Sequence, residues 1–259
     1  MYMQLDIKDF HQAKQLLNDH NSHYPLMEAV LQGDLTGSIY VDDYPKMTSA
    51  LIISRLDWVY VIGDEYNTKF ASETIRILSE KKTGKYIWFG VDNAWRDYIK
   101  THISCNIQDC PRFRYQFNGA EFEKNKNSDT ALCVNAINVY NYDWLSEKHR
   151  TSFDFWDSKE NFLNKGFGYF VKDNENVVSL ILSASVTDME AEIEIYTDEA
   201  FRGRGYAKQV AIRYIRECLS RGLHPKWDCD SKNEASFRLA DRLGFQKIEE
   251  YPLIYITLN

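Results

Sequence analysis

The chain lacks the features that mark membrane, secreted and zinc-binding proteins. No apolar run in its 259 residues approaches the roughly 20 residues that a membrane-spanning helix needs. Its start, Met1 to Phe10, has no basic stretch followed by an apolar one, as a signal peptide would. The five cysteines are odd in number and form no Cys-x-x-Cys pair, which argues against a disulfide framework and a zinc site. We therefore expect a cytoplasmic protein with no membrane partner.

Several catalytic and nucleic-acid-binding patterns are absent as well. The net charge is -7 and the lysines and arginines are scattered, so no nucleic-acid partner is expected. His102, His149 and His224 are isolated and no His-x-x-x-His spacing occurs, so no metal centre is expected. The serine-hydrolase pattern Gly-x-Ser-x-Gly and the nucleotide-binding loop Gly-x-x-x-x-Gly-Lys-Ser/Thr do not occur. A cationic small molecule suits the negative charge better as a partner.

A glycine-containing hexamer in the second half is the most informative segment that is present. Its residues are Arg202, Gly203, Arg204, Gly205, Tyr206 and Ala207. The two glycines let the backbone approach a ligand closely, and the start of the helix predicted after them favours an anion. The two arginines add positive charge. The hexamer therefore predicts a site for a pyrophosphate, and the alternative is a purely structural turn.

The strand-like run before the hexamer, Glu190–Thr197, alternates polar and apolar residues. Glu190, Glu192, Glu194 and Tyr196 should share one face of a strand, while the apolar residues between them face a helix. Because buried carboxylates are costly, the acidic face should either line a wet cleft for an amine or be an ordinary solvated face. A carboxylate in such a cleft can accept the proton that an ammonium must lose before it attacks. Glu192 is the first candidate for this general base and Glu194 the second.

Hydrophobic periodicity and turn residues predict alternating helices and strands along the whole chain. In the first half we expect helices over 9–20, 25–32, 67–82 and 93–101, and strands over 38–41, 50–54, 58–62 and 86–89. In the second half we expect helices over 144–155, 205–221 and up to Leu243, with a short one near 159–165. The strands expected there are 131–139, 168–172, 177–186, 190–197, 225–230, 245–249 and 253–258.

The segment 118–130 is polar and nearly without apolar residues, which is typical of a domain linker or a long hairpin loop. As a linker it divides the chain into an N-terminal domain of residues 1–120 and a C-terminal domain of residues 130–259.

Two sequence patterns resemble those of one enzyme family. The hexamer fits Arg/Gln-x-x-Gly-x-Gly/Ala, and the segment from Asn233 to Phe245 fits Asn-x-x-Ala/Ser followed by Leu-Gly-Phe. Here the chain resembles the GCN5-related N-acetyltransferases (GNAT), and the element order of its second half is similar to theirs. The resemblance implies a mixed α/β fold, with a GNAT domain in the C-terminal half and an additional N-terminal α/β domain. It also implies acetyl-CoA as co-substrate and no metal.

The resemblance further implies roles for particular residues. The hexamer would hold the pyrophosphate of acetyl-CoA, and Asn233 and Ser236 would line the pantetheine arm. The backbone from Ile195 to Thr197 would polarise the acetyl carbonyl, where one N–H can contribute on the order of 3 kcal/mol. Many members have, at the position of Ala240, a tyrosine that protonates the leaving thiolate, so the acid is unassigned here. A thiol of pKa about 8.5 can leave without one.

More narrowly, the chain resembles two-domain bacterial acetyltransferases related to the zwittermicin A resistance enzyme. This implies acetyl transfer to a primary amine of a small, cationic molecule by direct attack, with a link to antibiotic resistance. The N-terminal half would shape the acceptor pocket or make a homodimer contact, and its α/β alternation suggests a diverged copy of the same fold. The alternative is a non-catalytic acyl-CoA-binding module or sensor. Acetylation of a protein or an aminoacyl-tRNA is disfavoured by the acidic charge.

Overall fold

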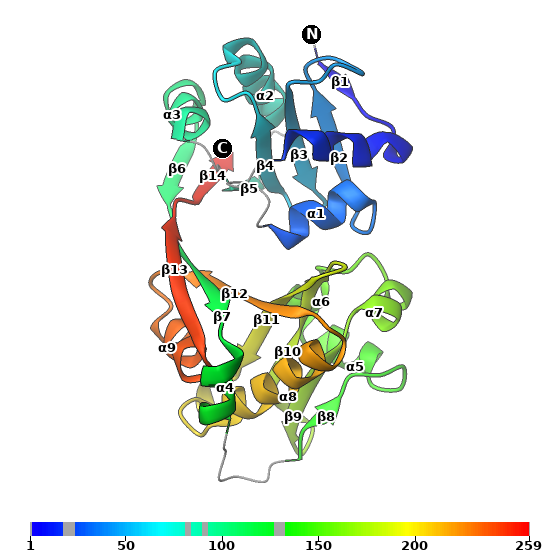
Figure 1. Cartoon of the computed structure of the whole chain (residues 1–259), viewed down its shortest axis with the longest axis vertical. Helices are drawn as coiled ribbons and strands as arrows, with labels where there is room; N and C mark the ends of the chain where they lie inside the picture. The colour runs from blue at the N-terminus through cyan, green and yellow to red at the C-terminus, as the bar shows by residue number, and fades with distance from the viewer. Residues whose placement is uncertain (1, 18–23, 81–83, 90–92, 127–132, 259) are drawn as a thin grey trace. The chain divides into compact units, whose positions relative to one another are not determined.

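The chain folds into two compact units, each built around its own mixed sheet (Figure 1). The computed structural model describes residues 2–17, 24–80, 84–89, 93–126 and 133–258. The first unit comprises Met1–Arg112 and Tyr251–Asn259, and the second comprises Phe113–Glu250. The division predicted between residues 120 and 130 thus differs from the one observed. The expected mixed α/β fold is confirmed.

The first unit contains the helices and strands of the N-terminal half together with the last strand of the chain. Its helices are the 3-10 helix η1 (Ile7–Leu16), α1 (Pro25–Gln32), α2 (Thr68–Glu80) and α3 (Asn93–His102). Its strands are β1 (Met3–Gln4), β2 (Gly37–Val41), β3 (Ser49–Ser54), β4 (Trp58–Gly63), β5 (Gly84–Phe89), β6 (Asn106–Asp109) and β14 (Ile254–Leu258). The helix predicted over 9–20 is a 3-10 helix that ends at Leu16, and residues 18–20 lie outside the described residues.

The second unit holds the longer strands of the C-terminal half. Its helices are α4 (Gly119–Asn125), α5 (Tyr142–Lys148), α6 (Arg150–Phe153), α7 (Lys159–Lys165), the 3-10 turn η2 (Glu199–Phe201), α8 (Tyr206–Ser220) and α9 (Glu234–Arg242). Its strands are β7 (Arg112–Phe117), β8 (Asn135–Ala136), β9 (Gly168–Asp173), β10 (Asn176–Val186), β11 (Glu190–Thr197), β12 (His224–Asp230) and β13 (Phe245–Tyr251).

The two sheets share one strand order. The first is β1-β2-β3-β4-β5-β14-β6 and the second, from its other end, is β8-β9-β10-β11-β12-β7-β13. In both, the fourth and fifth strands run parallel and are joined through a helix, α2 or α8. In both sheets, the sixth strand directly follows, in the amino-acid sequence, a strand that belongs to the other unit. β7 comes directly after β6, and β14 comes directly after β13, so the units exchange one strand each.

This exchange corrects the sequence-based placement of residues 253–258. They were expected to complete the C-terminal sheet, but β14 pairs antiparallel with both β5 and β6 (red in Figure 1). Its apolar side chains Ile254 and Ile256 are buried in the core of the first unit with Val61 and Trp95. Alternation correctly predicted a strand there, but a pattern of period 2 carries no information about which sheet the strand joins.

Part of the expected linker is instead a capped helix. Asn118 accepts hydrogen bonds from the N–H groups of Ala120 and Glu121, which is N-cap geometry, and α4 follows. Phe122 anchors α4 because its side chain is fully buried in the core of the second unit. The strand predicted over 131–139 is reduced to β8, and residues 127–132 lie outside the described residues.

Helices cover both faces of the second sheet. On one face Val210, Ala211 and Tyr214 of α8 pack with Ala191 and Ile193 of β11. On the other face, the core contains residues of α5, α6 and α7 together with β9 and β10, namely Tyr142, Leu145, Phe153, Phe162, Phe170, Leu180 and Leu182. No helix in the described part of the chain is long and apolar enough to cross a membrane.

Candidate functional site

The strand β11 divides its side chains between the two faces of the sheet as its alternation predicts. Ile193 and Ile195 pack on the α8 face, while Tyr196 packs with the cluster of α5 to α7. Glu194 lies on the latter face too, since its Oε1 accepts a hydrogen bond of 3.0 Å from Ser152 of α6. Ser152 is only 4% exposed, so a buried hydroxyl holds this carboxylate.

β11 and β12 part midway along their length. Among the described residues their parallel register joins three pairs, ending with Glu192 opposite Lys226. β11 continues for five more residues, Ile193 to Thr197, which stay paired with β10 on the other side. A strand that is paired on one side only presents backbone N–H and C=O groups on its open side. The stretch expected to polarise the acetyl carbonyl lies in this open half.

Three side chains donate hydrogen bonds to carbonyl groups of β11. They are Tyr214 to the Glu192 carbonyl at 3.2 Å, Ser179 to that of Tyr196 at 3.1 Å and Arg202 Nε to that of Thr197 at 3.3 Å. Burial raises the pKa of Tyr214 well above its usual range, so it remains a donor. Only the N–H groups of the backbone can bind an oxyanion here, because they donate hydrogen bonds whereas the carbonyl oxygens accept them.

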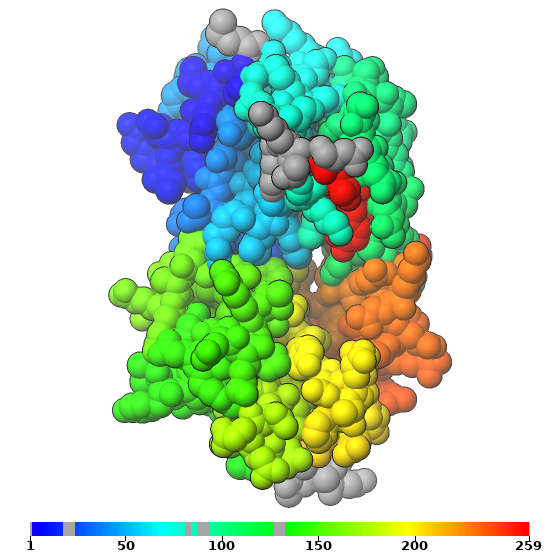
Figure 2. Space-filling view, turned by 180° about the vertical axis from the view of Figure 1, so that it is seen from behind, coloured from blue at the N-terminus to red at the C-terminus, as the bar shows by residue number. Residues whose placement is uncertain are grey.

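The glycine hexamer lies where β11 passes, through η2, into α8. Gly203 and Gly205 have φ angles of +77° and +85°, in the left-handed region that favours glycine. Apart from its neighbours in the chain, a Cβ placed on either glycine would meet no atom of the described residues within 4 Å, so the space beside them is open. Among the described residues no side chain caps α8 at Gly205, so its first N–H groups are left for solvent or a ligand. The yellow segment around residue 200 lies at the surface in Figure 2.

Both arginines of the hexamer are exposed and are held by neighbours. Arg202 forms an ion pair of 3.1 Å with Glu199, and the guanidinium of Arg204 lies 5.2 Å from the centre of the Phe201 ring. The ring of Tyr206 meets Phe201 edge-on at 6.2 Å. The hexamer thus combines two positive charges, an uncapped helix start and open space, which fits a pyrophosphate.

Asn233 and Ser236 both have structural roles at the start of α9. Asn233 Oδ1 accepts a hydrogen bond of 3.1 Å from the Ser236 N–H, so Asn233 is the N-cap. Ser236 Oγ accepts one of 3.1 Å from Trp227 Nε1 of β12. The Asn233 amide N–H2 and the Ser236 O–H remain as donors for a ligand. Ala240 stands at the position where many of the acetyltransferases that the chain resembles have a tyrosine, and it is fully buried on α9.

Comparison with known proteins decides the family. A sequence profile described as GNAT acetyltransferase matches residues 14–254. The chain belongs to the GNAT acetyltransferases. Uncharacterized N-acetyltransferase YdfB of Bacillus subtilis (strain 168) is 29% identical over 235 residues, 88% of each chain. The structure of a GCN5-related N-acetyltransferase-like protein from Streptococcus suis 89/1591 is similar, with a TM-score of 0.77, 25% identity and coverage of 97% of this chain and 100% of that one.

A tandem GNAT protein from the clavulanic acid biosynthesis pathway shares the fold over the whole chain. Its TM-score is 0.65 at 10% identity, covering 100% of this chain and 98% of the other. As a GNAT protein the chain is an acetyltransferase, and members of the family generally take the acetyl group from acetyl-CoA. Among the described residues no group of three or more His, Cys, Asp or Glu could hold a metal ion.

Sequence reasoning missed two residues beside the acidic face of this GNAT unit. Besides Ser152, His149 at the junction of α5 and α6 lies with its ring 4.8 Å from that of Tyr196. Burial, aided by Lys148, lowers the pKa of His149, so the ring is neutral at pH 7. Both contacts join segments more than forty residues apart in the chain, for Ser152 and Glu194 a separation of 42. No local sequence signal could therefore have revealed them.

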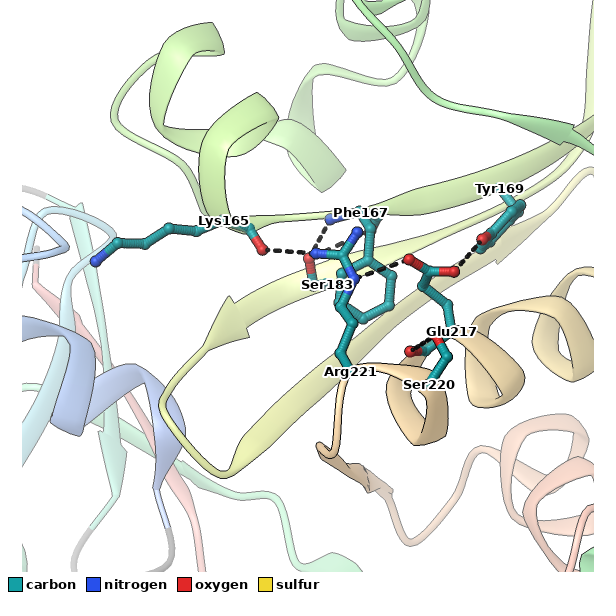
Figure 3. A network of polar contacts seen from close by, with 7 residues as sticks. All are labelled: Lys165, Phe167, Tyr169, Ser183, Glu217, Ser220 and Arg221. Atoms are coloured by element: carbon teal, nitrogen blue, oxygen red, sulfur yellow. Dashed lines mark hydrogen bonds and ion pairs between the residues drawn. The ribbon is translucent and has the colours of Figure 1, made fainter.

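A polar network fixes the far end of α8 (Figure 3). Glu217 accepts hydrogen bonds from Arg221 Nε at 2.8 Å and from the Tyr169 hydroxyl at 3.1 Å. The Arg221 guanidinium also lies 4.4 Å from the ring centre of Phe167. Burial and Glu217 raise the pKa of Tyr169 to about 12, so its hydroxyl stays protonated and donates. The network ties α8 to β9, which fixes the direction in which the helix start points.

Proposed function

We propose that this chain transfers the acetyl group of acetyl-CoA to a primary amine of a small, cationic molecule by direct attack of the amine. The observation that carries the proposal is the open half of β11, which leads through η2 to an uncapped helix start. One element thereby offers N–H groups for the thioester oxygen, and the next offers an anion site for the pyrophosphate.

Acetyl-CoA, the acetyl donor, would be held by two neighbouring segments of the chain and by the start of α9. Arg202, Gly203, Arg204, Gly205, Tyr206 and Ala207 would bind the pyrophosphate, and the backbone of Ile195, Tyr196 and Thr197 would polarise the thioester. Asn233 and Ser236, through their remaining donors, would line the pantetheine arm. Because Ala240 offers no acid, the sulfur would leave as a thiolate, which its pKa of about 8.5 allows.

The acceptor would be recognised by acidic side chains of β11 and β12. On β12, Trp227 and Cys229 are buried with α9, so Asp228 and Asp230 point to the opposite face of the sheet. Since Lys226 is in register with Glu192, this face is the one that carries the β11 carboxylates. Four carboxylates on one face, from Glu192, Glu194, Asp228 and Asp230, favour a cation.

The proton of the attacking ammonium would be accepted by Glu192, with Glu194 as the second candidate. Glu192 stands at the last paired position, where the two strands part. The carboxylate of Glu194 already accepts the Ser152 hydroxyl, which favours a role in binding the ammonium charge.

The relation to the zwittermicin A resistance enzyme, and with it a role in antibiotic resistance, stays a prediction. The shared strand order of the two sheets supports the proposal that the N-terminal unit is a diverged copy of the GNAT fold.

The test is thiol release from acetyl-CoA with a panel of small amines that includes polyamines and neutral amines. We expect turnover with cationic amines, abolished or lowered by more than a hundredfold in Glu192→Gln, with the affinity for CoA retained. Glu190→Gln is the matched control, because Glu190 lies on the same face of β11 but is ion-paired with Lys226 at 3.1 Å.

Two outcomes would contradict the proposal. Tight CoA binding without turnover on any amine would contradict transfer to a small amine. Turnover in Glu192→Gln equal to that in Glu190→Gln would assign the proton to another group, and Glu194→Gln would then be measured in the same assay.

A further inference from the structure

Ser185 of β10 carries a buried hydroxyl for which the described residues provide no hydrogen-bond partner. It is 3% exposed, and in the described part of the chain its Oγ has no partner. A buried hydroxyl without a partner destabilises a fold, so such groups are nearly always bonded to protein or to ordered water. A molecule outside the chain is therefore expected beside Ser185.

Ser185 is directly opposite Glu192 in the antiparallel register of β10 and β11. Residues opposite each other in such a pair share a face, with Cβ atoms about 5 Å apart. The register shifts between Ser183 and Ser185, so Ala184 is an extra residue at this point. Such bulges re-aim side chains and are frequent next to active sites. The Oε2 atom of Glu192 is likewise shielded from solvent.

Several charged and polar groups on this face are engaged with one another, and the carboxylates of Asp228 and Asp230 lie on the same face of β12. On β12, Lys226 forms its ion pair with Glu190, and Glu194 accepts the hydroxyl of Ser152. From the α8 face, the Tyr214 hydroxyl donates to the backbone carbonyl of Glu192 at 3.2 Å, and the Glu192 charge is one of the groups that raise the pKa of Tyr214. The hydroxyl opposite Glu192 is thus the side-chain donor for which these contacts supply no acceptor.

We propose that Ser185 and Glu192 together hold a water molecule, through which the acceptor amine passes its proton to Glu192. Ser185 is then a positioning residue for the transfer. A buried water needs two to four polar contacts, and a serine hydroxyl, a carboxylate oxygen and the incoming ammonium supply three. This inference rests on the proposed function, since it names the path to the base proposed above.

Protons and bonds are conserved in the proposed transfer. The ammonium gives one proton to the water while the water gives one to Glu192, which leaves a neutral amine. The amine nitrogen bonds to the thioester carbon, the C–S bond breaks and the electron pair leaves on sulfur. The second nitrogen proton neutralises the thiolate, so the products are the amide, CoA thiol and one proton on Glu192, which solvent then takes.

The experiment compares Ser185→Ala with Ser183→Ala in the thiol-release assay over pH 5 to 9. For Ser185→Ala we expect kcat at pH 7 about tenfold lower and the acid limb of kcat/KM about one pH unit higher, because the water that donates to the carboxylate and favours its charged form is no longer held in place. KM for acetyl-CoA should not rise, and the melting temperature should not fall. Ser183 is the control because its hydroxyl bonds to the Phe167 backbone, so its loss should lower the melting temperature and leave the pH profile in place.

Ser185→Cys, of similar size with a weaker donor, should lie between wild type and Ser185→Ala. A wild-type pH profile in Ser185→Ala, with Glu192→Gln inactive, would overturn the inference and leave the proposed function standing. A wild-type chain that acetylates no amine would contradict the proposed function itself. A high-resolution crystal structure tests the water site independently of activity. An ordered water between Ser185 Oγ and Glu192 supports the inference, and the absence of such a water overturns it.

Discussion

The hydroxyl of Ser152 lies 3.0 Å from Glu194 Oε1 and joins the short helix α6 to the strand β11. This hydrogen bond ties the two elements together, because the Ser152 hydroxyl is only 4% exposed and has little access to water as an alternative partner. The acidic face of the acetyltransferase unit is therefore held in place from the helix side as well as from within the sheet.

Replacing Ser152 with alanine should measurably weaken the fold. Hydrogen bonds to charged groups contribute about 1.5 to 3 kcal/mol, so urea unfolding of Ser152→Ala should show a loss in that range. Ser146→Ala is the control, since its hydroxyl donates to the carbonyl of Asp143 on the same helix, and it should change stability by about 0.5 kcal/mol or less. Equal losses in the two variants would show that the contact with Glu194 contributes nothing.

The stability of the protein should depend on pH through His149. Its pKa is lowered in the fold, chiefly by burial, so below about pH 6.5 the unfolded chain binds more protons than the folded one. The contribution is thus complete above pH 6.5 and is lost as the pH falls through the lower pKa of the folded state. His149→Asn should flatten this part of the stability curve, measured by urea unfolding from pH 5 to 8. His224→Asn, the same change at an exposed histidine, is the control.

The glycines at the two ends of α8 allow strain to be separated from ligand binding. Gly203, Gly205 and Gly222 all have positive φ angles and open space around them. Alanine at each should therefore cost a similar 1 to 2 kcal/mol, about the penalty of the left-handed region. Only Gly203→Ala and Gly205→Ala should also raise the Kd for CoA, by about tenfold or more, in calorimetric titrations. A weaker affinity in Gly222→Ala as well would show that strain alone accounts for the effect.

One molecule of acetyl-CoA per chain is expected, because the N-terminal unit fills the corresponding position with its own residues. Asn67 caps α2 by accepting a bond of 3.0 Å from the Phe70 N–H, and its Nδ2 lies 3.1 Å from Asp42 Oδ2. Burial alone would raise the pKa of Asp42, but hydrogen bonds from Thr48 and Ser49 outweigh it, so the carboxylate stays charged. A negative charge at a capped helix start repels a pyrophosphate. A calorimetric stoichiometry of two would contradict this.

Much of the second unit was predictable because its signals are local. The alternation in β11 and the turn before β10, where Asn174 takes a φ of 53°, identify strands without knowledge of their neighbours. The hexamer was found in the same way. α4 was missed because one buried residue, Phe122, anchors an otherwise polar segment. Ser152 and His149 contact side chains that are far away in sequence, and Ser185 gains its role from the register of two paired strands and from its burial. The sheet that β7 and β14 join depends on which neighbouring strands leave a position for them.

The place of β14 has a consequence for how the protein is made. Translation delivers the N-terminal unit first, but the strand that lies between β5 and β6 is Ile254–Leu258. Until those residues leave the ribosome, the first sheet has a vacancy in its interior, and both flanking strands present unpaired backbone groups. The sheet of the half that is synthesised first can therefore be completed only after the sequence of the other half has been synthesised.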